Sequence, residues 1–182
     1  MKKKFVLFTV LLFFAMSMYA KESSTENETP KFETSVNLLG LFSGRYGGKV
    51  EMPVTPSGNF SLAFLGSYFN RSILGVTTSG YDLFLNARIY PAKQMKEIYF
   101  GVEGGYSAFT YDEFTDDEYV SSIPLMALVG YKWVINKVAL DLGFAGGKKF
   151  YLGEMDSDTS DVLNSFPFNF SYDLFFLVGY QF

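Results

Sequence analysis

From residue 32 to residue 182 the sequence alternates between apolar and polar side chains with a period of two. This alternation indicates β-strands with two unlike faces, because successive side chains of a strand point to opposite sides. After residue 31 no apolar stretch reaches the ~20 residues that a membrane-spanning helix needs. We therefore predict an all-β chain of eight antiparallel strands, at residues 32–42, 45–53, 59–68, 79–90, 98–109, 122–134, 137–147 and 169–182.

Side-chain size separates the two faces of these strands. One face carries bulky apolar groups, as at Phe170, Tyr172, Leu174 and Phe176, whereas the other is rich in Gly, Ser and Ala and carries charge on every strand except the third. The interior of an eight-stranded barrel is barely wide enough for side chains. Small residues and a few long charged ones would fill it, and large aromatics would suit lipid. The pattern favours an up-and-down transmembrane β-barrel over a soluble barrel with an apolar interior.

Aromatic residues and connections support the same prediction. Large aromatics fall near the strand ends, as expected for two girdles at the bilayer interfaces. One predicted girdle holds Phe42, Tyr46, Tyr68, Tyr81, Tyr106, Phe144 and Tyr172, and the other holds Phe32, Phe60, Phe100, Tyr131, Trp133, Tyr180 and Phe182. Connections are short at residues 55–58, 91–97 and 135–137 and longer at 69–78, 110–121 and 148–168, and all six prolines are expected outside strand interiors or at their rims.

The charged residues of the mixed face form a candidate lumen network. Its members are Lys49, Glu51, Asp82, Arg88, Glu103, Lys132, Asp141 and Asp173, with Arg45 nearby in the pattern. Unpaired charge in a narrow lumen is costly, so these groups are expected to pair. Two interpretations follow: a salt-bridge plug that stabilises the barrel, or a gated polar conduit whose pairs open to pass small ions.

The first 31 residues precede the barrel. Lys2, Lys3 and Lys4 come before an apolar run over residues 5–15, and small residues at Ser17 and Ala20 offer cleavage sites. This layout is typical of a bacterial secretory signal peptide over residues 1–20, followed by a flexible polar leader over 21–31 and a barrel over 32–182. Removal of the signal would change the formal net charge from −4 to −7. An acidic chain of this kind argues against a nucleic-acid partner.

Composition excludes most chemistry. The chain has no Cys and no His, which removes disulfides, zinc fingers, iron–sulfur clusters and imidazole-based hydrolases. Residues 143–148, Gly-Phe-Ala-Gly-Gly-Lys, are one residue short of a phosphate loop and are followed by Lys149 instead of Ser or Thr. Residues 156–161 lack the Gly and the bidentate Glu of a calcium loop. We therefore expect no cofactor, no metal and no enzymatic activity.

The chain end carries the most specific motif. Phe182 closes a strand with Tyr180, Val178 and Phe176 at alternate positions, which resembles the C-terminal assembly signal of bacterial outer-membrane proteins. Residues 32–182 resemble the small eight-stranded outer-membrane barrels of the OmpA, OmpX and OmpW type, and most closely the families described only as outer membrane protein beta-barrel domains. The runs at residues 86–91 and 130–133 look like segments that recur in such families.

This resemblance implies a bacterial outer-membrane protein, a monomer that contacts lipopolysaccharide and phospholipid and is inserted by the barrel-assembly machinery. The expected role is structural or surface-interacting, through external loops that contact lipid or partners. The alternative is a narrow channel or a carrier for small ions or hydrophobic ligands. Barrel enzymes of the outer membrane rely on a catalytic His, so the resemblance does not bring their activity to this chain.

Overall fold

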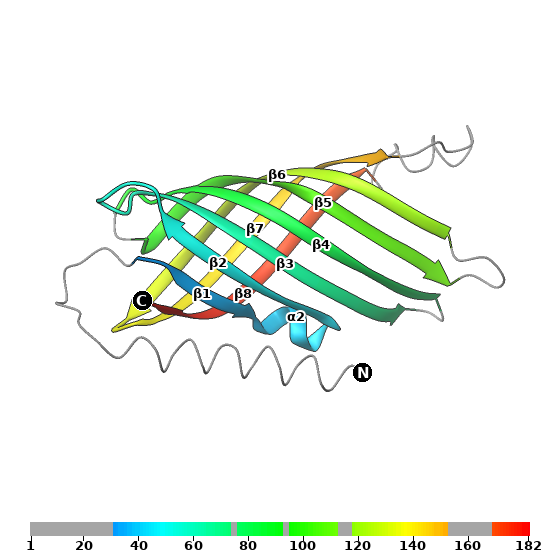
Figure 1. Cartoon of the computed structure of the whole chain (residues 1–182), viewed down its shortest axis with the longest axis horizontal. Helices are drawn as coiled ribbons and strands as arrows, with labels where there is room; N and C mark the ends of the chain where they lie inside the picture. The colour runs from blue at the N-terminus through cyan, green and yellow to red at the C-terminus, as the bar shows by residue number, and fades with distance from the viewer. Residues whose placement is uncertain (1–30, 74–75, 93–94, 113–117, 153–168) are drawn as a thin grey trace.

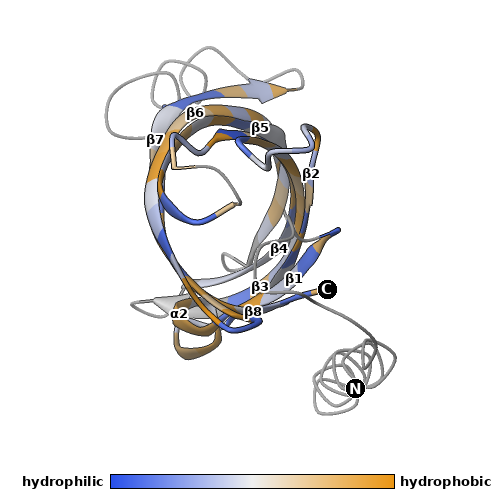
Figure 2. Cartoon of the chain, turned by 90° about the vertical axis from the view of Figure 1, so that its left-hand side faces the viewer, coloured by the Kyte–Doolittle hydropathy of each residue, from blue (hydrophilic) through white to orange (hydrophobic). Residues whose placement is uncertain are grey.

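The chain forms a closed antiparallel barrel of eight strands joined in sequence order, β1-β2-β3-β4-β5-β6-β7-β8 (Figures 1 and 2). The structure is a computed structural model that describes residues 31–73, 76–92, 95–112, 118–152 and 169–182. The strands are β1 (Glu33–Asn37), β2 (Arg45–Pro53), β3 (Phe60–Ile73), β4 (Val76–Ile89), β5 (Glu97–Asp112), β6 (Glu118–Ile135), β7 (Val138–Leu152) and β8 (Phe170–Gln181). The predicted all-β barrel is confirmed.

Pairing of β1 with β8 closes the barrel. Glu33 lies opposite Gln181, and the register continues to Asn37 opposite Leu177. An even number of antiparallel strands brings the beginning of β1 and the end of β8 to one end, which we call the terminal end. The strand ends that flank residues 54–59, 90–96 and 136–137 lie there, and those that flank residues 43–44, 74–75, 113–117 and 153–169 lie at the opposite end, which we call the loop end.

The first strand is shorter than predicted. It ends at Asn37, and a short helix, α2 (Leu38–Phe42), takes the place of its second half. The Asn37 side chain caps this helix by accepting a hydrogen bond from the Gly40 amide at 3.1 Å. Five apolar or glycine residues in a row have no alternation to hold them in a two-faced strand, and the cap favours a helical turn.

Three connections were predicted too long. β3 extends to Ile73 and β4 begins at Val76. Most of the predicted loop at 69–78 therefore belongs to these two strands, with only residues 74–75 between them. β5, β6 and β7 also extend toward the loop end, to Asp112, from Glu118 and to Leu152. These extensions are rich in polar residues, so the hydrophobic alternation that marks a strand fades before the strand ends.

The prediction that every proline lies outside strand interiors or at a strand rim is wrong for Pro124. It is the seventh residue of β6 and pairs with Lys149 of β7. On the other side the β5–β6 ladder is interrupted at residues 105–106 and 123–124. Proline has no amide proton for a ladder, and the interruption accommodates it.

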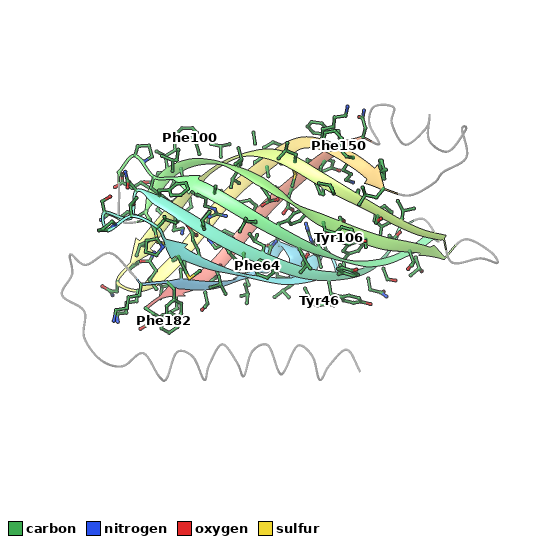
Figure 3. All side chains as sticks on the ribbon, turned by 45° about the horizontal axis from the view of Figure 1, so that its top comes forward. Tyr46, Phe64, Phe100, Tyr106, Phe150 and Phe182 are labelled. Carbon is green, nitrogen blue, oxygen red and sulfur yellow. The ribbon has the colours of Figure 1, made fainter. Side chains whose placement is uncertain are left out.

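The faces have the predicted polarity. Large apolar side chains such as Phe64, Leu85, Leu125 and Leu174 are exposed on the outside. Figure 3 shows Tyr46, Tyr106 and Phe150 toward the loop end, Phe100 and Phe182 toward the terminal end, and Phe64 between them. Phe144 does not fit its predicted girdle, because β7 extends to Leu152 and leaves it near the middle of the strand.

Several sequence predictions fall outside the described residues. They are the signal peptide at 1–20, nearly all of the leader at 21–31, and the acidic segment at 156–161. Among the described residues no helix is both long and apolar enough to cross a membrane.

Candidate functional site in the barrel lumen

Six charged side chains from five strands meet inside the terminal half of the barrel. They are Glu33, Lys49, Glu51, Arg88, Lys132 and Asp141, each with at most 2% of its surface exposed. We call this set the plug. Three positive and three negative formal charges cancel within it, which is the condition for burying so many ions together.

Glu51 is the centre of the plug. Its Oε2 lies 2.6 Å from the Lys49 ammonium nitrogen, 2.8 Å from that of Lys132 and 3.3 Å from Arg88 Nη1. Its Oε1 accepts a hydrogen bond of 2.6 Å from the Ser61 hydroxyl. Both oxygens of this buried carboxylate are therefore occupied, and the desolvation of the charge is offset by several short contacts.

The remaining acids link the same cations. Asp141 Oδ2 lies 2.7 Å from Lys49 Nζ and 2.8 Å from Arg88 Nη1. The Glu33 carboxylate lies 3.0 Å from Lys49 Nζ through one oxygen and 3.0 Å from Lys132 Nζ through the other. Because each cation touches at least two acids, removing any one charge leaves several partners uncompensated.

Two tyrosines seal the plug. The Tyr99 hydroxyl donates to Asp141 Oδ1 at 2.6 Å, and the Tyr99 ring lies 4.6 Å from the Arg88 guanidinium carbon. The Tyr90 hydroxyl donates to Glu51 Oε1 at 2.6 Å from the connection that follows β4. Burial raises the pKa of the Tyr90 phenol well above its usual value, so the phenol stays protonated and can donate this hydrogen bond.

Glu103 lies beside the plug without an ion pair of its own among the described residues. Its side chain is buried and accepts a hydrogen bond from the Asn86 amide nitrogen, while Asn86 Oδ1 accepts from Arg88. Its other oxygen, Oε1, has no hydrogen-bond partner in the described part of the chain. Asn86 thus connects Glu103 to the plug through Arg88.

The plug acids also meet the simplest geometric test for a metal site. One oxygen each from Glu33, Glu51 and Asp141 lie within 4.8 Å of one another. The same carboxylates are in contact with Lys49 and Lys132, whose ammonium groups supply the positive charge that a cation would bring. The donor set therefore fits internal ion pairs and not a resident metal.

A second polar cluster lies toward the loop end. The Arg45 guanidinium bridges Asp82 at 2.8 Å and Asp173 at 2.9 Å. Asp82 also accepts from the hydroxyls of Ser67, at 3.0 Å, and Ser107, at 2.5 Å. Buried apolar side chains, among them Phe84, Met126, Leu128, Phe175 and Leu177, lie between this cluster and the plug along their strands.

A cavity of about 360 Å³ adjoins the second cluster in the loop half of the barrel. Arg45, Asp82 and Asp173 contribute to its lining together with the aromatic rings of Phe69, Phe84 and Phe109. A smaller space of about 30 Å³ shares Arg45, Phe84 and Asp173 with it. Among the described residues the lumen thus contains a cavity toward the loop end and a packed, charged plug toward the terminal end.

The predicted lumen residues divide between these regions. Lys49, Glu51, Arg88, Lys132 and Asp141 lie in the plug, Asp82 and Asp173 lie in the loop-end cluster, and Glu103 lies beside the plug. Sequence reasoning missed Glu33, Asn86, Tyr90 and Tyr99 as members of the network. Strand parity could have found all four, because each lies on the charged face of its predicted strand; Tyr90 is the last residue of the predicted strand 79–90.

The predicted assembly residues lie where the barrel closes. The Phe182 ring stacks on Phe32 with centroids 4.4 Å apart and meets the Tyr180 ring edge-on at 4.9 Å. The Phe182 amide donates to the Phe32 carbonyl at 2.9 Å. Val178 lies opposite Val36 of β1 and Phe176 opposite Leu142 of β7.

No protein-family model matches the chain, and no curated protein matches it. A solved structure with a similar arrangement is that of a major outer membrane protein from Thermus thermophilus. It is 14% identical, with a TM-score of 0.44, over 83% of this chain and 99% of that one. The likeness is weak and carries no argument about function.

Proposed function

We propose that the chain is an integral β-barrel of the bacterial outer membrane with a structural or surface-interacting role. The observation that carries this proposal is the inverted polarity of the barrel. Its outer face exposes large apolar side chains on every strand from β2 to β8, whereas its interior holds the buried ions. Such a large exposed apolar surface would promote aggregation in water, whereas the hydrocarbon core of a membrane solvates it. The closed ladder also leaves few backbone groups without hydrogen bonds, as a bilayer requires.

Cell fractionation and gel mobility test this proposal. The full chain, expressed in a bacterium with an outer membrane, should fractionate with that membrane and change its mobility when boiled, as folded membrane barrels do. Recovery as a soluble periplasmic protein with one mobility would overturn the proposal. The same experiment tests the predicted export signal, because the unprocessed and processed chains differ in length.

The plug favours a closed lumen over the alternative of a narrow channel. Its side chains are at most 1% exposed and in contact across the barrel, so no water path passes between them. Refolded protein in planar bilayers should give no reproducible single-channel steps. Steps of uniform size from pure protein would favour the gated conduit.

The loop-end cavity favours a carrier as the second candidate function. Its volume of about 360 Å³ lies within the range of small-ligand sites. The surface-interacting role would use the external connections at the same end, where lipopolysaccharide and protein partners would be met. The chain would act as a monomer, inserted by the barrel-assembly machinery.

A further inference from the structure

The barrel wall has a seam at α2 that no strand ladder closes. β1 pairs with β2 only as far as Gly48 and with β8 only as far as Leu177. Beyond these points no strand of the described residues lies beside residues 45–47 of β2 or residues 171–176 of β8 on this side of the wall. The helix α2 packs against both strands there instead (Figure 1).

The helix is held by its chain connections to β1 and β2 and by packing against β8. Among the described residues no backbone hydrogen bond joins α2 to β8, whereas β7 and β8 remain paired from Lys148 opposite Phe170 onward. Opening the wall at a strand ladder would leave backbone groups without hydrogen bonds in the bilayer, at a cost of several kcal/mol each. Opening it between α2 and β8 breaks no ladder, so this part of the wall opens most easily. The exposed side chains of the helix are apolar, with Phe42 exposed over 91% of its surface.

The seam leads into the lumen. The small space of about 30 Å³ is lined by Asn37, the cap of α2, by Gly47 and Gly48 of β2, and by Leu177 of β8. It shares Arg45, Phe84 and Asp173 with the loop-end cavity, so the two spaces meet at the same side chains. A molecule that displaced α2 from the outer leaflet would reach that cavity without crossing the plug.

The lining indicates what the cavity would hold. The lining is amphipathic: the rings of Phe69, Phe84 and Phe109 provide apolar surface, and polar side chains provide the larger part. The charged lining residues are Arg45 and Lys149 against Asp82 and Asp173, so their formal charges cancel. The Asp173 side chain keeps 19% of its surface accessible while it holds Arg45. Such a site suits an apolar chain with a head group of zero net charge, since a buried net charge would lack compensation.

We propose that the seam at α2 is a lateral entrance through which a single-chain amphiphile with a zwitterionic head reaches the loop-end cavity from the membrane. The inference rests on the proposed membrane location and deepens the carrier function. It assigns the ligand class to the cavity and the route to the seam.

Quenching by a brominated lysophosphatidylcholine tests the site. In a Trp133→Phe background, Phe84→Trp places the only indole at the cavity, and Leu85→Trp, on the next residue and outside, gives a matched control. Quenching of the inner indole should saturate and be reversed by unbrominated lysophosphatidylcholine, whereas quenching of the outer one should follow the lipid content. A brominated fatty acid, with its anionic head, should bind about tenfold more weakly. Identical, unsaturable quenching at both positions would overturn the site.

A glycine pair tests the route. A Cβ at Gly40 would lie 2.6 Å from the Arg45 carbonyl oxygen and would push α2 from the wall, whereas one at Gly104 would meet only ordinary contacts, the nearest at 3.6 Å. Gly40→Ala should therefore speed the approach to saturation several-fold, and Gly104→Ala should not change it. Equal rates in the two variants would overturn the lateral entrance.

Two controls separate the possible failures. Heat-modifiable mobility of each variant shows that the barrel is inserted, so an inserted barrel without saturable binding rejects the carrier but not the membrane location. If Phe84→Trp does not fold, native mass spectrometry of the wild-type chain replaces the reporter. One bound lysophosphatidylcholine should then be retained and should be lost in Ser171→Phe, which fills the cavity. Equal retention by the wild type and that variant would overturn the proposal.

Discussion

Replacing Lys49 by methionine tests the energetic role of the plug. Lys49 is buried and lies within 3.0 Å of carboxylate oxygens of Glu33, Glu51 and Asp141. Methionine keeps much of the volume and removes the charge, which leaves three acids to share the charges of Lys132 and Arg88. Breaking a buried ion pair by removing one partner costs about 3–5 kcal/mol, because the other partner stays buried without compensation. We expect Lys49→Met to lower the free energy of unfolding by about that amount.

A second substitution isolates the charge effect. Asp141→Asn alone should also destabilise, because it leaves one positive charge in excess. Combined with Lys49→Met it restores a balance of two cations and two acids, and the Asn oxygen can still accept from Tyr99, which donates to this position in the wild type. The double variant should therefore cost less than the sum of the singles, by at least about 1 kcal/mol.

Urea unfolding in detergent micelles measures these differences. Trp133 is the only tryptophan of the chain, and it follows Lys132 of the plug on the outer face, so its fluorescence reports unfolding near the site. Lys31→Met is the matched control, since Lys31 is exposed and a surface substitution changes stability by about 0.5 kcal/mol or less. A loss in Lys49→Met no larger than that of the control, or a double variant that costs the sum of the singles, would refute the electrostatic account.

Two further predictions concern closure and interior space. Phe182→Ala removes the stack on Phe32 and the edge contact with Tyr180, and each aromatic pair is worth about 0.5–1.5 kcal/mol. The substitution should therefore lower the free energy of unfolding by about 1–3 kcal/mol and slow insertion into liposomes that hold the assembly machinery. Phe42→Ala is the control, and equal behaviour of the two variants would contradict the role of Phe182 in barrel closure. Gly130→Ala places a Cβ 2.2 Å from the Tyr99 hydroxyl oxygen and should cost about 1–3 kcal/mol in urea unfolding, whereas Gly104→Ala should be nearly neutral; an unchanged midpoint for Gly130→Ala would show that Tyr99 is free to move.

The sequence predicted most of the barrel because two simple constraints agree. Alternation assigns each residue to one of two faces, and the narrow interior of an eight-stranded barrel decides which face is inside. Asp82, Arg88 and Asp141 were placed in the lumen by this reasoning alone, and they lie there. Interior aromatics such as Phe84 and Phe175 are exceptions to the rule that small residues fill a narrow lumen, and they form the apolar layer below the cavity.

The errors come from places where alternation carries no information. Residues 38–42 are apolar on both parities, so a strand and a helix fit the pattern equally, and the Asn37 cap decides the outcome. The ends of β3 and β4 that face the loop end are polar on both faces, as at Asn70 and Thr78, and they were predicted as loop although their ladder continues. Pro124 was predicted at a strand rim, yet one interrupted ladder beside it suffices to keep it within β6.

Residues 38–42, which were predicted as strand and form α2, make the two halves of the barrel different. In the terminal half β1 is a complete strand, the ladder is closed all around, and the plug fills the lumen with ions that touch across the barrel. In the loop half α2 replaces β1, the wall lacks one ladder, and the lumen is a cavity. A gap in the ladder beside the plug would let lipid reach fully buried charges, whereas the gap at α2 lies beside a cavity whose charged groups keep part of their surface accessible. The missing ladder thus lies at the level of the cavity, and the complete ladder surrounds the plug. The fully paired terminal half can therefore stabilise a barrel whose loop half lacks one ladder.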